Sequence, residues 1–140
     1  MSDAYDVIAM PAADLSTELR NLILSRWMRS LRFGNDYFKL MVPQSFYDNY
    51  DRYILNTLAK AWVRLAVLAD DRDVVLGFAV FRHVMTGGIL DYVHVHKDQR
   101  RQGIAKALVP SGTHTITHLT RTGLSIWGSK HPEWKFDPFA

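Results

Sequence analysis

Apolar side chains recur every three or four residues in two segments of the N-terminal half, which is the spacing of an amphipathic helix. The first helix begins after a cap at Asp14 or Ser16 and ends near Arg32. The second begins at Pro43, a residue that favours the first turn of a helix, and a turn at 33–37 joins the two. Their apolar positions are Leu15, Leu19, Leu22, Ile23, Trp27 and Leu31, and then Phe46, Tyr50, Tyr53, Ile54, Leu58 and Trp62.

Short apolar runs bounded by turn residues predict one strand before these helices and three after them. The polar and glycine-rich turns between the last three are short enough for hairpins, so we expect an antiparallel meander. Gly77, inside the middle strand of the meander, indicates a bulge or a close approach of two backbones. The four predicted strands cover residues 5–10, 63–68, 74–84 and 89–96.

The chain after residue 101 carries a mixed pattern. Residues 102–109 are helical in character, but Pro110 removes a backbone donor. Threonines then alternate with other residues, as they would on a strand: Thr113, His114, Thr115, Ile116, Thr117 and His118. We nevertheless expect a kinked or two-piece helix to Thr120, because a parallel strand needs a crossover of about a dozen residues, which is usually helical. Residues 123–127 would then be the next strand, and residues 129–140 an aromatic arm or edge strand that covers apolar surface.

Length and composition restrict the function classes. The 140 residues are the length of one domain, and we expect 1–140 to form a single one. The absence of cysteine excludes disulfides, thiolate metal sites and a cysteine nucleophile, and we expect no metal. A net charge of +3 is smaller than a nucleic-acid-binding module would carry. Without a signal-like segment or a run long enough to span a bilayer, a cytoplasmic protein with no membrane partner is expected.

A basic, glycine-bearing turn stands between the last predicted strand and the helix after it: Arg100-Arg101-Gln102-Gly103-Ile104-Ala105. The first amides of a helix have no partner within the helix, and the helix dipole is positive there, so such a turn binds anions. Gly103 lets a ligand approach the backbone, and Ala105 leaves room on the next turn. The pyrophosphate of a nucleotide-containing cofactor is the expected ligand.

This turn resembles the Q/R-x-x-G-x-G/A signature of the GNAT N-acetyltransferase superfamily, with Arg100, Gly103 and Ala105 at the specified positions. The preceding Tyr92-Val93-His94-Val95-His96-Lys97-Asp98 is similar to the family's fourth strand and the link after it, and the resemblance thins out after Thr120. It implies an α+β fold: a mixed, mostly antiparallel sheet flanked by helices, with a V-shaped splay between strands 4 and 5. The compact length and the Tyr-Val-His-Val strand also resemble small acetyltransferase-like proteins of bacteriophages.

The resemblance implies direct transfer of an acetyl group from acetyl-CoA to a primary amine, on a small molecule or on a protein lysine or N-terminus. Backbone groups of Val93 and Val95 would pair with the pantetheine arm as an added strand does. Amides of the turn would hold the pyrophosphate, and its basic side chains would add charge. The implied cofactor-binding residues of the turn are Arg100, Arg101, Gln102, Gly103, Ile104, Ala105 and Lys106.

The residues that would move protons are open to several interpretations. Asp91 is a candidate for the strand carboxylate that the family often uses through water, and His94 has a pKa better matched to neutral pH. Many family members carry a tyrosine after the fifth strand as the acid, but this sequence has none after Tyr92. Tyr92, Ser129, His131 or water would have to replace it. Alternation predicts two faces of the strand, one with Asp91, Val93 and Val95 and the other with Tyr92, His94 and His96.

The acceptor pocket is expected at the turn 33–37, with Trp27 and Arg29 nearby and Asp36 attracting a cationic amine. The alternative function is a catalytically weak acyl-CoA-binding or regulatory protein of the same fold, because the usual acid is missing. Homodimers are common in the family, and the aromatic tail is a possible contact. The sequence therefore predicts a cofactor site more firmly than it predicts turnover.

Overall fold

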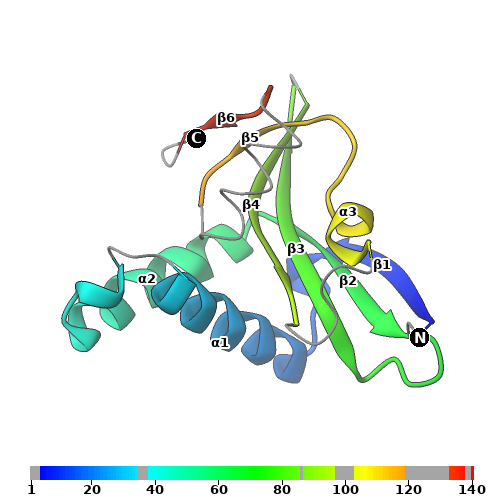
Figure 1. The fold of residues 1–140 in the computed structure, drawn as a ribbon, viewed down its shortest axis with the longest axis horizontal. Helices are drawn as coiled ribbons and strands as arrows, with labels where there is room; N and C mark the ends of the chain where they lie inside the picture. Colours follow the sequence, from blue (N-terminus) through cyan, green and yellow to red (C-terminus); the bar gives the residue numbers. More distant parts are fainter. Residues whose placement is uncertain (1–3, 35–37, 86, 97–102, 119–132, 138–139) are drawn as a thin grey trace.

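The computed structural model describes residues 4–34, 38–85, 87–96, 103–118, 133–137 and 140 (Figure 1). Two long helices follow the first strand, and three strands follow the helices. A short helix and two short strands complete the described part of the chain. The elements are β1 (Tyr5–Pro11), α1 (Thr17–Gly34), α2 (Pro43–Leu58), β2 (Trp62–Leu68), β3 (Val75–Val84), β4 (Gly87–Val95), α3 (Ile104–Leu108), β5 (Thr113–Ile116) and β6 (Lys135–Phe136), with 3-10 turns at Ala12–Asp14 and Phe38–Leu40.

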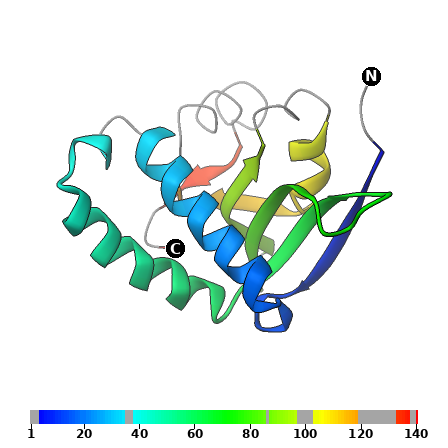
Figure 2. The same cartoon turned by 90° about the horizontal axis from the view of Figure 1, so that it is seen from below.

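The six described strands form one sheet in the order β1-β2-β3-β4-β5-β6. The first four are antiparallel neighbours, whereas β5 runs parallel to β4 and β6 runs parallel to β5. Helices α1 and α2 cover one face of this sheet and α3 lies on the other (Figure 2). This is the mixed, mostly antiparallel sheet flanked by helices that the sequence predicts.

Two hydrophobic clusters fix the helices to the sheet. The larger one, between α1, α2 and the sheet, buries Trp27, Phe46 and Phe78 completely. The smaller one lies under α3 and buries Ile104 and Leu108 against the other face. Most of the apolar positions predicted for the two long helices contact the larger cluster, but Trp62 begins β2 and is 42% exposed.

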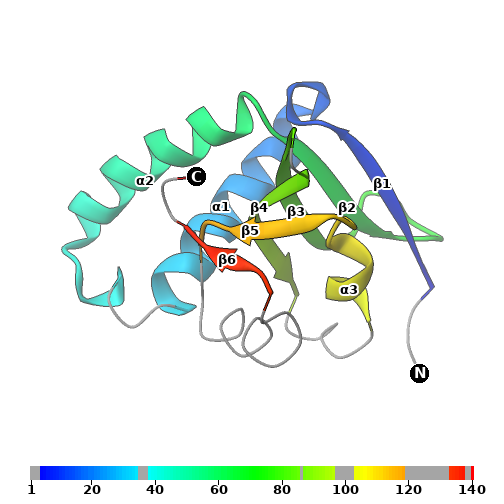
Figure 3. The same ribbon diagram turned by 90° about the horizontal axis from the view of Figure 1, so that it is seen from above.

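The predicted helix to Thr120 is wrong. Helix α3 ends at Leu108, and Val109 is already extended, since a residue before proline is pushed out of the helical region. Gly112 then takes a φ of +84°, and the threonine-rich alternation forms β5. In the described part of the crossover between the parallel strands β4 and β5, α3 has five residues (Figure 3).

The C-terminal segment is described only in part. The predicted strand at 123–127 and the residues Ser129 and His131 lie outside the described residues. Within the predicted arm, Trp134 is buried in the smaller cluster, and β6 pairs with β5 at the edge of the sheet. Among the described residues of this segment, Trp134 thus packs on apolar side chains, whereas Phe136 is exposed.

The prediction for Gly77 is confirmed. The β2–β3 ladder shifts register between Ala66 and Val67, which leaves an extra residue on β3 next to Gly77. A Cβ on Gly77 would lie 2.7 Å from the backbone oxygen of His94 and 3.2 Å from Cδ1 of Leu108. The missing side chain therefore lets β4 and α3 pack closely at this point.

Candidate functional site

The β4 strand carries a bulge at Asp91. Val80 pairs with Tyr92 and Phe81 pairs with Leu90, so Asp91 is an extra residue that has no partner position on β3. A bulge breaks the alternation of side chains. As a result, Asp91 shares with Tyr92 the face under α1 and α2, whereas Val93 and Val95 pack in the cluster under α3. The prediction that Asp91 lies on the face of Val93 and Val95 is therefore wrong.

The Asp91 carboxylate is fully buried and held by two neighbours. Arg82 donates from Nε to Oδ2 and from Nη2 to Oδ1, both at 2.7 Å, which makes a bidentate ion pair. The Thr117 hydroxyl donates to Oδ1 at 3.0 Å. The hydrogen bonds that Arg82 donates to Asp91 raise the pKa of Arg82, against an opposing effect of burial. Because it accepts three hydrogen bonds, this carboxylate holds Arg82 and Thr117 in fixed orientations.

Tyr92 and His94, the other two candidates on β4, contact the same larger cluster. The Tyr92 ring stacks on Trp27 with 5.1 Å between centroids, and its hydroxyl lies 2.6 Å from Oγ of Ser30. The His94 ring packs on Phe78 at 5.6 Å. The bond to Ser30 directs the Tyr92 hydroxyl toward α1.

His118, just after β5, is a site residue that the predictions missed. Its imidazole lies among three aromatic rings of α1 and α2, with centroid distances of 5.9 Å to Trp27, 6.3 Å to Tyr50 and 5.1 Å to Tyr53. Nδ1 is 3.0 Å from the Thr117 hydroxyl, next to Asp91. The signal in the sequence was the threonine alternation, which places His118 beside a strand rather than on a helix.

Burial sets the protonation of these packed side chains, Trp27, Tyr50, Tyr53 and His118, which we call the aromatic pocket. Burial lowers the pKa of His118, although the negative charge of Asp91 and a hydrogen bond to the Asp91 carbonyl oppose this. Burial also raises the pKa of Tyr50 and Tyr53. All three are therefore neutral near pH 7. Nε1 of Trp27 is buried and has no acceptor among the described residues.

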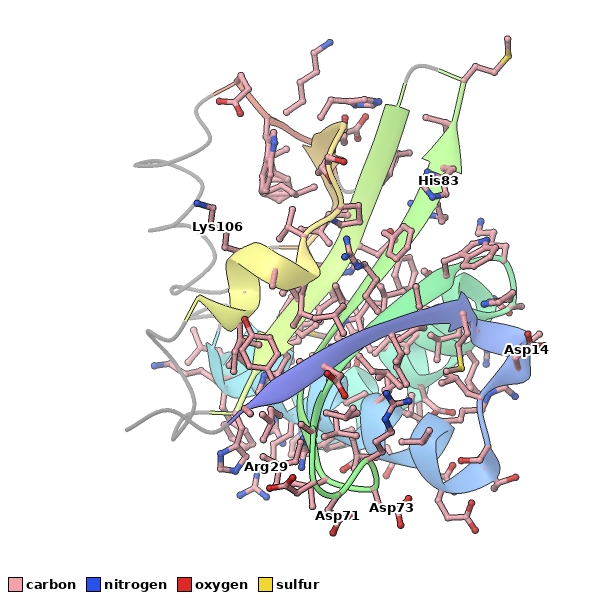
Figure 4. All side chains as sticks on the ribbon, turned by 90° about the vertical axis from the view of Figure 1, so that its right-hand side faces the viewer. Asp14, Arg29, Asp71, Asp73, His83 and Lys106 are labelled. Carbon is pink, nitrogen blue, oxygen red and sulfur yellow. The ribbon has the colours of Figure 1, made fainter. Side chains whose placement is uncertain are left out.

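The described part of the predicted cofactor turn begins at Gly103, the N-cap of α3, with a φ of +77°. Nothing in the described structure lies within 4 Å of a Cβ built there, so the backbone conformation, and not a steric contact, explains the glycine. Ile104 is buried, Ala105 packs against the smaller cluster, and Lys106 is exposed on the outer side of α3 (Figure 4). Arg100, Arg101 and Gln102 lie outside the described residues.

The predicted acceptor residues are only partly brought together. Trp27 belongs to the aromatic pocket, whereas Arg29 is exposed on α1 (Figure 4). Asp36 and most of the turn 33–37 lie outside the described residues. In the described part of the chain, no group of three or more candidate ligand side chains could hold a metal ion, and no helix is long and apolar enough to cross a membrane.

The described pairing between strands β4 and β5 lies near the start of β4. Gly88, Ile89 and Leu90 pair with residues of β5, and the Thr117 amide donates to the Leu90 carbonyl at 3.1 Å. This ladder ends beside the bulge, so the aromatic pocket, Asp91 and the second half of β4 meet at one place in the molecule.

Residues 25–119, more than half of the chain, match the Acetyltransferase (GNAT) family. Among solved structures, a GCN5-related N-acetyltransferase from Ralstonia eutropha JMP134 is similar at 12% identity and a TM-score of 0.63, over 91% of this chain and 92% of that one. A predicted acetyltransferase with acetyl-CoA from Clostridium acetobutylicum is similar at 13% identity and a TM-score of 0.54, over 91% and 89%. At these identities the similarity shows the fold.

A ribosomal-protein-alanine N-acetyltransferase from Brucella melitensis biovar Abortus 2308 has 22% identity and a TM-score of 0.48, over 75% of this chain. This chain spans 66% of the length of that protein. Among curated proteins, none matches the sequence.

Proposed function

Because the chain belongs to the GNAT acetyltransferase family, we propose that it moves an acetyl group from acetyl-CoA to a primary amine by direct transfer. The observation that supports this best is the path of β4: it passes through the bulge at Asp91 beside the aromatic pocket and is followed by the glycine turn that opens α3. The same strand therefore contributes to the proposed cofactor-binding site and lies beside side chains that can ionise.

The proposed cofactor grip lies at the second half of β4 and the turn after it. Backbone groups of Val93 and Val95 would pair with the pantetheine amides, and amides near Gly103 would receive the pyrophosphate. Arg100 and Arg101 would supply positive charge. The match to the family and the similarity of fold to a protein solved with acetyl-CoA support this assignment.

The acceptor amine would enter on the α1 and α2 side. The partly buried rings of Tyr50 and Tyr53 would contact the alkyl or aromatic part of an amine, and the fully buried Trp27 would back the ring of His118. The bidentate Arg82–Asp91 pair keeps a fixed, nearly neutral charge distribution beneath them. The class of amine, small molecule or protein, stays a prediction.

A second candidate is an acyl-CoA-binding or regulatory protein without turnover. Two observations favour it: the sequence has no tyrosine after Tyr92, and the Asp91 carboxylate is occupied by Arg82 and Thr117. It shares the cofactor grip with the first proposal and differs from it only in the chemistry at the pocket.

Titration calorimetry with acetyl-CoA, followed by thiol release against a library of amines, tests both functions. Binding with steady thiol release supports the enzyme, binding without release supports the second candidate, and no binding contradicts both. Gly103→Glu should abolish binding. Gly112→Glu is the matched control, because Gly112 has the same kind of positive φ and no described atom within 4 Å, but lies at the other end of the crossover.

A further inference from the structure

The polar chain that leads to His118 fixes the tautomer of its imidazole. An ionised carboxylate only accepts hydrogen bonds, so the Thr117 hydroxyl donates its one proton to Oδ1 of Asp91, at 3.0 Å. The Thr117 oxygen must then accept a hydrogen bond from Nδ1 of His118, also at 3.0 Å. The ring also donates a hydrogen bond to the backbone carbonyl of Asp91, whose oxygen lies 3.3 Å from the same Thr117 hydroxyl. Assigning both bonds to Nδ1–H leaves the lone pair of the neutral ring on Nε2.

We propose that His118 is the residue that accepts, through Nε2, the proton lost by the acceptor amine, and that it then returns this proton to the thiolate of coenzyme A. The assignment rests on the proposed function. His118 would then act both as the base and as the acid, in place of the tyrosine that many family members carry after the fifth strand.

The proton and electron balance of the step is complete. The lone pair of a neutral primary amine attacks the thioester carbonyl, and a C–N bond forms. His118 takes a proton from the resulting ammonium, which is far more acidic than a free alkylammonium because its nitrogen is bonded to the tetrahedral carbon. The C–S bond then breaks, the electron pair leaves with sulfur, and the imidazolium protonates that sulfur. The products are an N-acetylamine and coenzyme A with a free thiol.

The surroundings of the ring favour this cycle. The groups that face it are Tyr50 and Tyr53 from α2, Asp91 from β4 and Arg82 from β3, together with the neutral Trp27 from α1. The lowered pKa keeps the ring unprotonated at neutral pH, as a base requires. Thr117 and Asp91 act as positioning residues, since they hold Nδ1–H and so direct Nε2.

The other candidate bases fit less well. The Asp91 carboxylate already accepts three hydrogen bonds from Arg82 and Thr117. The His94 ring packs on Phe78, with 5.6 Å between the ring centroids. His118 combines a ring oriented by Thr117 with a place among the aromatic rings of α1 and α2.

The sharpest variant is His118→Asn, because the asparagine amide can still donate to Thr117 from about the position of Nδ1 while Nε2 is removed. We expect kcat to fall by about 10²–10⁴-fold, while the Kd for acetyl-CoA changes by less than about twofold. His114→Asn is the matched control. His114 lies at the other end of β5, contacts Thr115 through Nδ1 at 2.7 Å, and is not one of the four residues of the aromatic pocket. Its kcat should be unchanged.

Two further readouts separate chemistry from folding. Added imidazole should raise the activity of His118→Ala by at least about tenfold, because it can replace the missing base. A purely structural role of His118 does not allow such a rescue. The acid limb of the pH profile of kcat/KM in the wild type should lie below pH 6.5 and disappear from the residual activity of His118→Asn. A wild type that binds acetyl-CoA but releases no thiol with any amine overturns the proposed function, and this inference with it. An active wild type whose His118→Asn variant keeps its kcat and acid limb overturns only the role of His118.

Discussion

The two faces of the sheet bury different kinds of groups. Under α1 and α2 lies a large cluster that includes an ion pair, a threonine hydroxyl and an imidazole. Under α3 lies a smaller cluster of apolar side chains, and α3 itself has five residues. A short helix on a small cluster is easily displaced, whereas a buried polar network is rigid only while every partner is present. We therefore expect damage under α3 to affect cofactor binding first, and damage under α1 and α2 to affect stability and proton transfer.

Loss of Arg82 should have the largest effect. Arg82→Met leaves the fully buried Asp91 carboxylate without its cation, and removing one partner of a buried pair costs about 3–5 kcal/mol. Urea denaturation of the variant measures this loss. The double variant Arg82→Met/Asp91→Leu should lose less than the single one, because no unpaired charge stays buried. If the free energy of unfolding of Arg82→Met lay within about 1 kcal/mol of the wild-type value, the Arg82–Asp91 ion pair would behave like a solvent-exposed one, contrary to this prediction.

The same substitution on the two faces sharpens the comparison. Leu58 and Leu108 are both fully buried, the first in the larger cluster and the second under α3. Each change to alanine should lower the free energy of unfolding by about 2–5 kcal/mol. Only Leu108→Ala should also weaken acetyl-CoA binding, by about tenfold or 1.4 kcal/mol, because α3 positions the proposed phosphate turn. Equal affinities of Leu58→Ala and Leu108→Ala for acetyl-CoA, measured by calorimetry, would contradict the different roles of the two faces of the sheet.

Gly77 tests the contact between β3, β4 and α3. Alanine there would clash with the His94 carbonyl at 2.7 Å, which cannot move without shifting β4, and we expect a loss of about 1–3 kcal/mol. Gly88→Ala is the control, since the nearest atoms to its Cβ are those of Thr113 at 3.6 Å. A Gly→Ala change without strain is neutral or stabilises by about 0.4–1 kcal/mol. Thermal denaturation that ranks the two variants in the opposite order would contradict the close packing.

The smallest expected effect is a pH dependence of stability. Because burial lowers the pKa of His118 below 6.5, the unfolded state binds more protons between the folded pKa and 6.5. The free energy of unfolding should therefore fall as the pH is lowered through this window. His118→Asn should lose this part of the dependence and His114→Asn should keep it. Urea denaturation at several values between about pH 5 and 8 measures the difference. Identical profiles for the two variants would contradict the buried, neutral state of His118.

Local patterns were enough to predict the long elements. Helices α1 and α2, the meander and the turn at Gly103 follow from apolar spacing and from turn residues, which act over a few neighbouring positions. The error at 109–118 arose where two local signals competed: we weighted the need for a crossover above Pro110 and the threonine alternation. In the described residues of the crossover, the helix is the short α3, and β5 follows it.

The candidate site could be predicted only in part, because its key feature is a register shift. Nothing near Asp91 in the sequence marks it as the extra residue of β4; the bulge exists only relative to the pairing with β3. Simple alternation therefore placed Asp91 on the wrong face. The proposed roles of Asp91, His94, Tyr92 and the turn residues stay predictions.

The sequence by itself determined where the two long helices and the first four strands form and which turn follows β4, because those preferences belong to single residues and their near neighbours. Only the tertiary structure decided that Asp91 turns toward Arg82 and that His118, after β5, enters a pocket built by α1 and α2. Both depend on contacts between segments far apart in the chain, whose geometry is set when the sheet register and the helix packing form together.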